Sequence, residues 1–168
     1  MWQNKYAELP DGMESKELEP YIEEFLAEND ITKDYDKMFG ELHELGDRQW
    51  HSYELMNPQL LERFDSWFRL KLCDDEFDFH YINAAIGVMG MFGLVQSFNE
   101  LKNIRNNIQN ENVIAIIDDV LKYGEKRIMD PYISFWDPTY RPRPACEITL
   151  NPYEPLLFYQ IKKSRYTM

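Results

Sequence analysis

The least polar stretch of the chain, INAAIGVMGMFGLV at residues 82–95, sets the strongest limit on how the chain folds. It is shorter than the roughly 20 apolar residues that a membrane-spanning helix needs. A phosphate-binding loop would place its glycines between a strand and a helix and would add a lysine, whereas GVMGMFG contains no polar residue and no lysine. The segment therefore predicts the buried centre of a helical fold. We expect one long helix over residues 79–104.

Three glycines, Gly87, Gly90 and Gly93, recur at intervals of three within this stretch. Glycine costs about 1 kcal/mol relative to alanine inside a helix. Because packing has to offset that cost, we expect the three glycines to form a shallow groove into which a neighbouring helix packs closely.

Apolar residues elsewhere recur mostly with helical periodicity, which predicts further helices. The predicted helices cover residues 17–29 with Pro20 in the first turn, residues 32–46 with Thr32 as cap and Gly46 as end, a segment starting at Asn57-Pro58, and residues 111–124 ending at Gly124. In the helix that starts at Asn57-Pro58, we expect Asp65 to face solvent.

Residues 130–155 differ in composition, because they hold most of the prolines together with many aromatic residues. They predict a proline-stiffened loop with one short helix from Asp130-Pro131. A helix starting at Asn151-Pro152 competes with a short strand over residues 156–161. The expected fold is all-α: one acidic domain over residues 1–168, built as a helical bundle or as stacked helical hairpins around a central helix.

The net charge of −12 is unevenly distributed, with −9 in residues 1–46, −6 in residues 47–121 and +3 in residues 122–168. An acidic surface repels nucleic acid and anionic membranes, and it suits either solubility or a basic partner. Cys73 and Cys146 form no CxxC pair, which is typical of reduced thiols. The polar residues 1–12 lack the pattern of a signal peptide, so we expect a cytoplasmic protein.

Motifs for catalysis or metal binding are missing from the sequence. Asp47 stands where a zinc-protease HExxH motif starting at His43 needs its second histidine, and no Glu-x-x-His pair occurs. The DDEFD run at 74–78 lacks the glycine and distal glutamate of an EF-hand. The arginine-to-histidine spacing of helical endoribonucleases, GxSxG and SxxK are absent as well. We expect no catalytic residue, no metal and no cofactor.

The sequence favours a protein-binding function over catalysis: an acidic module that neutralises a basic partner, in particular an immunity protein that blocks a bacterial toxin of the nuclease type. For each acidic cluster taken alone, a solvated helix face or a helix cap is a better explanation than a contact patch. Two alternatives stay open, a small helical enzyme or ligand-binding protein with a pocket of Asp78, His80, His43 and tyrosines, and a nucleic-acid mimic. The predicted contact residues are Glu23, Glu24, Glu28, Asp34, Asp36, Asp74, Asp75, Glu76 and Asp78.

Overall fold

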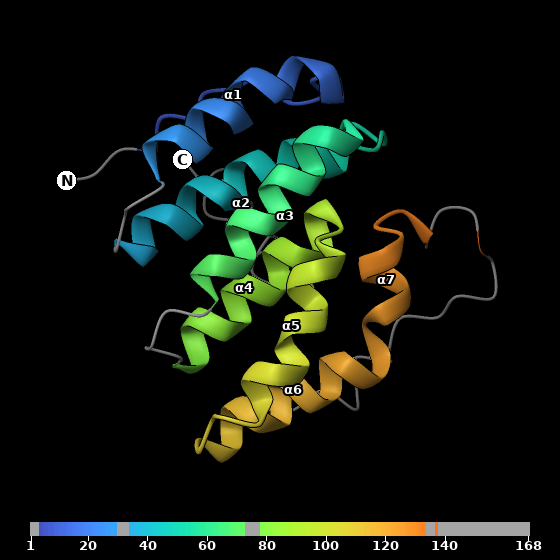
Figure 1. Cartoon of the computed structure of the whole chain (residues 1–168). Helices are drawn as coiled ribbons and strands as arrows, with labels where there is room; N and C mark the ends of the chain where they lie inside the picture. The colour runs from blue at the N-terminus through green and yellow to red at the C-terminus, as the bar shows by residue number, and fades with distance from the viewer. Residues whose placement is uncertain (1–3, 30–33, 73–77, 134–136, 138–168) are drawn as a thin grey trace, which may run out of the picture.

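The computed structural model describes residues 4–29, 34–72, 78–133 and 137. Over these residues the chain is all-α, as the sequence predicts, and no strand occurs among them. The choice between helix and strand at 156–161 lies outside the described residues. The helices are α1 (Ser15–Glu28), α2 (Tyr35–His51), α3 (Pro58–Lys71), α4 (Phe79–Phe92), α5 (Val95–Arg105), α6 (Glu111–Tyr123) and α7 (Glu125–Met129) (Figure 1).

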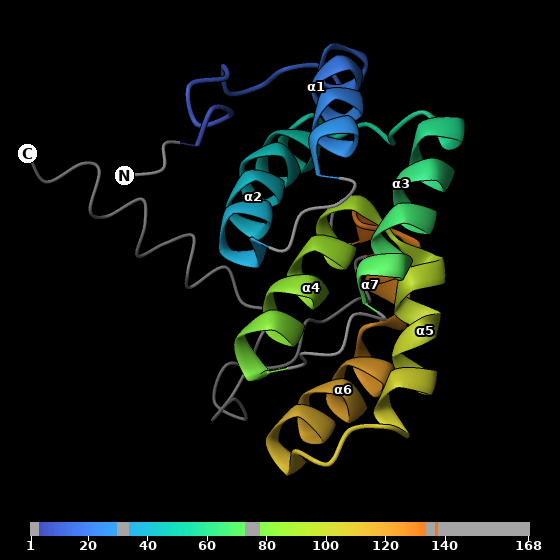
Figure 2. The same cartoon turned by 60° about the vertical axis from the view of Figure 1, so that its left-hand side comes forward.

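Consecutive helices from α1 to α4 run in alternating directions (Figures 1 and 2). The last turns of α1 and α3 therefore lie at the same end of the molecule as the first turns of α2 and α4. Helix α1 contacts α2 and α3. Helix α2 packs on α4, and α3 packs on α5. Both α4 and α5 also contact α6 and α7. None of the described helices is long and apolar enough to cross a membrane.

Polar side chains cap most of the helix starts, since they accept hydrogen bonds from backbone N–H groups that have no partner in the first turn. Helix α1 begins with a capping box of Glu14 and Glu17, so Pro20 lies inside it, and the prediction that places Pro20 in the first turn is wrong. The predicted cap Thr32 lies outside the described residues. The capping side chains of α2, α3, α4 and α6 are Asp34, Asn57, Asp78 and Asn110.

The long helix expected over residues 79–104 is wrong, because Gly93 divides it into α4 and α5. Gly93 adopts the left-handed conformation (φ 75°), and its N–H donates to the Met89 carbonyl at 2.9 Å, which ends α4. A Cβ atom at Gly93 would lie 3.1 Å from Pro131 Cγ and 3.2 Å from the Ile128 carbonyl oxygen. Both the backbone conformation and the neighbours therefore favour glycine at this position.

The close approach between α2 and α4 occurs at Gly46. The prediction that Gly46 ends its helix is wrong, because α2 continues to His51. A Cβ atom at Gly46 would lie 2.9 Å from Met91 Sδ and 3.1 Å from Phe92 Cε2. A Cβ atom at Gly87 would have His43 Cε1 as its nearest neighbour, at 3.7 Å, and a Cβ atom at Gly90 would have Ile128 Cδ1, at 4.0 Å. The predicted groove of Gly87, Gly90 and Gly93 is therefore wrong. The glycine at the close contact between the two helices is Gly46 of α2.

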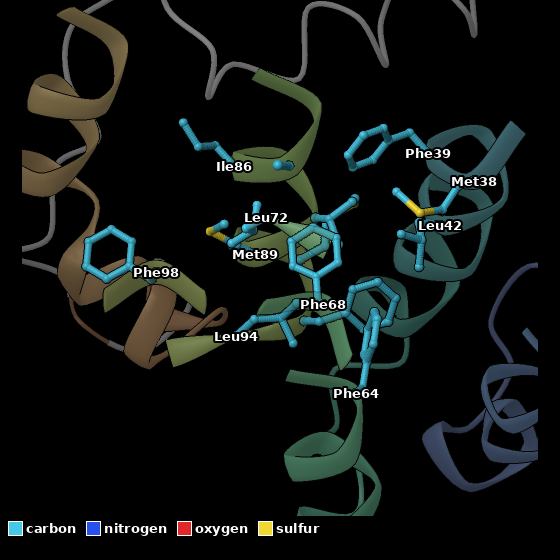
Figure 3. Packing of buried hydrophobic residues seen from close by; sticks show 14 of the residues in the cluster. Met38, Phe39, Leu42, Phe64, Phe68, Leu72, Ile86, Met89, Leu94 and Phe98 are labelled. Carbon is cyan, nitrogen blue, oxygen red and sulfur yellow. The ribbon is translucent and has the colours of Figure 1, made fainter. Parts of the chain in front are cut away.

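The hydrophobic core takes residues from each of the helices α1 to α7, and the part that Figure 3 shows lies between α2, α3, α4 and α5. Aromatic rings meet edge to face within it, as with Phe64 and Phe92, whose centroids are 4.8 Å apart. The residues labelled in Figure 3 are Met38, Phe39, Leu42, Phe64, Phe68, Leu72, Ile86, Met89, Leu94 and Phe98. After α7 the Ile133 N–H donates to the Asp130 carbonyl in a turn, and the rest of the short helix expected there lies outside the described residues.

Asp65 belongs to this core, and the prediction that it faces solvent is wrong. Its side chain is 4% exposed, and its two carboxylate oxygens accept hydrogen bonds from the backbone N–H groups of Gln96 and Ser97, each at 2.8 Å. The Ser97 hydroxyl donates to the same carboxylate. Asp65 of α3 therefore caps the first turn of α5, which has no cap from its own preceding residue.

Candidate protein-binding surface

The acidic face of α1 is set by the period of its apolar residues. Leu18, Ile22 and Phe25 are buried against α2 and α3, so the residues on the opposite side of the helix point away from the core. Glu23, Glu24 and Glu28, three of the predicted contact residues, are exposed on this outer face.

Two basic residues from other parts of the chain partly compensate these three carboxylates. Lys5 Nζ lies 2.7 Å from a carboxylate oxygen of Glu24 and 2.6 Å from one of Glu28. Burial lowers the pKa of Lys5, but the hydrogen bonds to the two glutamates outweigh it and hold that pKa above its ordinary value. The hydrogen bond from Lys5 lowers the pKa of Glu28. Arg63 of α3 forms the ion pair with Glu23, with Nη1 and Oε1 2.9 Å apart.

A groove of about 630 Å³ runs between α1 and α3 beside the Glu23–Arg63 ion pair. Its apolar lining includes the buried Leu26 and the half-buried Trp67, whereas Glu62 on its edge is exposed. Within the described part of the chain, Glu62 forms no ion pair. The full lining is Glu23, Leu26, Ala27, Glu62, Arg63, Ser66 and Trp67.

Trp67 is held in place by aromatic and cationic neighbours. Its ring meets Phe25 of α1 edge to face, with the centroids 5.5 Å apart. Lys71 Nζ lies 5.5 Å from the centroid of the indole ring. The groove therefore has an aromatic wall next to exposed carboxylates. The sequence does not predict this groove, because the sequence pattern identifies Trp67 only as part of the apolar face of α3.

The remaining predicted contact residues belong to helix starts. Asp34 accepts the Lys37 N–H at 3.1 Å, Asp78 accepts the Tyr81 N–H at 2.7 Å, and both stay exposed. Asp36 is exposed in the first turn of α2. Because α1 to α4 alternate in direction, these three aspartates and Glu28 lie at the same end of the four helices (Figures 1 and 2). Asp74, Asp75 and Glu76 lie outside the described residues.

The histidines of the enzyme alternative lie apart from this surface. His43 is half-buried between α2 and α4, and burial lowers its pKa. His80 is exposed in the first turn of α4, where its ring meets Phe79 edge to face. Among the described residues no three His, Cys, Asp or Glu side chains converge as metal ligands.

Fold and surface together define an all-helical protein with an acidic groove between its first and third helices. Comparison of the chain with protein-family models, with curated proteins and with solved structures finds no match. Inference about its function therefore starts from the residues of this surface.

Proposed function

We propose that this protein is an acidic protein-binding module that neutralises a basic partner. The observation that supports the proposal is the exposed acidic face of α1, which adjoins a groove walled by Trp67. Complementary charge speeds the encounter of two proteins and enforces specificity. Buried aromatic anchors such as tryptophan supply much of the binding energy. The surface offers both kinds of contact side by side.

The partner class that fits best is the basic domain of a nuclease-type toxin, which makes this chain an immunity protein. A nuclease binds phosphates through basic residues, so an acidic protein that covers those residues blocks the substrate. The charge distribution supports this reading, because −9 of the net charge falls in residues 1–46, which contain the whole of α1.

The first experiment is co-expression of this chain with the protein encoded by the adjacent gene. We expect that protein to carry a toxic basic domain, to co-purify with the chain and to lose its toxicity in its presence. Because the contact is electrostatic, the complex should weaken as salt rises from about 0.05 M to 0.5 M. An adjacent gene product that does not bind at the lowest salt concentration, or whose toxicity persists when the two are co-expressed, would contradict the proposal.

A further inference from the structure

The groove between α1 and α3 has more specific chemistry than the acidic surface around it. It is a depression of about 630 Å³ that is open to solvent along its length. One wall is apolar, formed by Leu26 and Trp67, and the edge carries exposed charges. A group that fits must therefore combine a flat or apolar part with a charge.

The charges on the groove favour a cation. Arg63 forms its ion pair with Glu23, and the side chains of these two residues are 62% and 54% exposed. The pair neutralises itself, which leaves Glu62 as the carboxylate of the lining without an ion pair among the described residues. An incoming positive group would contact Glu62 directly and would share the Glu23 carboxylate with Arg63.

Trp67 selects among cations. Lys71 Nζ lies 5.5 Å from the ring centroid, so this indole already holds one positive charge, and an incoming cation has to share the ring with Lys71 or displace it. A guanidinium group is planar, stacks on aromatic rings and donates two parallel hydrogen bonds to a carboxylate, whereas an ammonium group does neither as well. A groove that combines Trp67 with Glu62 therefore suits arginine better than lysine.

We propose that the groove between α1 and α3 binds an arginine side chain of the partner, with the guanidinium between Glu62 and Trp67. This inference rests on the proposed function, because it assigns the point at which the basic partner anchors. It adds a residue-level specificity that a merely acidic surface does not have.

The test is an NMR titration of the ¹⁵N-labelled full chain with a capped tetra-arginine peptide at low salt. Replacement Trp67→Phe assigns the Trp67 indole signal. We expect the largest shifts at this indole and at the amides of Ala27 and Ser66. The peptide should bind the Glu62→Gln variant about two- to fivefold more weakly than the wild type, the range expected for one exposed ion pair. A tetra-lysine peptide should bind the wild type more weakly than tetra-arginine.

Glu111→Gln is the matched control, because it removes the same charge from an exposed residue of α6 that lines no part of the groove. It should leave tetra-arginine binding within the error of the wild type. Equal weakening by Glu62→Gln and Glu111→Gln, or shifts spread over all acidic helices, would overturn the arginine site. The proposed protein-binding function would survive a negative NMR titration if the basic partner still co-purified with the chain. Failure of both the titration and the co-purification would contradict the arginine site and the proposed function together.

Discussion

At the scale of the residue, the main surprise is which charged side chains are buried. Asp65 is 4% exposed because three donors of α5 compensate its carboxylate. Arg48 is also 4% exposed. It forms an ion pair with Glu44, one helical turn earlier, and it donates to the carbonyl groups of Ala7 and Leu9. A charged residue near an apolar stripe normally points outward. The Glu44 partner follows from helical periodicity, but the partners of Asp65 and the two carbonyl groups that bind Arg48 are 31 to 41 residues away in sequence, and the local sequence does not indicate them.

We predict that Asp65→Ala lowers the free energy of unfolding by about 2–3 kcal/mol. The substitution removes the acceptor and leaves two backbone N–H groups of α5 without their hydrogen bonds. Ser97→Ala removes one donor and leaves the capping of the backbone intact, so it should cost only about 1 kcal/mol. Urea denaturation measures both values. A loss for Asp65→Ala no larger than that for Ser97→Ala would show that the carboxylate does not hold α5 on α3.

At the scale of the element, the sequence predicts some helix ends correctly and others not. The start of α3 at Asn57-Pro58 and the end of α6 before Gly124 are confirmed. Gly46 and Gly93 are assigned the wrong way round, since the first lies inside a helix and the second ends one. The difference comes from tertiary contacts, with Met91 and Phe92 facing Gly46 and with Ile128 and Pro131 facing Gly93. The local sequence does not contain these contacts.

Gly46 of α2 and Gly87 of α4 should respond in opposite ways to alanine. Gly87→Ala should raise the free energy of unfolding by about 0.5–1 kcal/mol, because alanine favours the helix and the new Cβ has room beside His43. Gly46→Ala should lower it, because moving the ring of Phe92 and the end of Met91 within a packed core costs about 1–3 kcal/mol, more than the roughly 1 kcal/mol that alanine gains over glycine in a helix. Thermal and chemical unfolding of the two variants measure the difference. A stabilised Gly46→Ala variant would mean that α2 and α4 are not in close contact there.

At the scale of the whole molecule, the sequence predicts the all-α class and the exposure of the α1 glutamates, and both are confirmed. The groove could not be predicted in the same way. It forms because α3 packs beside α1 and places Glu62 and Trp67 next to Glu23, about 40 positions earlier in the chain. Whether these residues contact a partner stays a prediction, as does the role of Asp34, Asp36 and Asp78 at the end of the four helices.

The most direct test of the binding surface is calorimetry with the purified basic partner at about 0.1 M salt. Glu23→Gln with Glu62→Gln removes both carboxylates of the groove, and Glu111→Gln with Glu125→Gln makes the same change in charge on α6 and α7. We predict that the groove variant binds about five- to thirtyfold more weakly than the wild type, while the control variant stays within about twofold. Equal affinities of the two variants for the partner would contradict the assignment of binding to the acidic groove between α1 and α3.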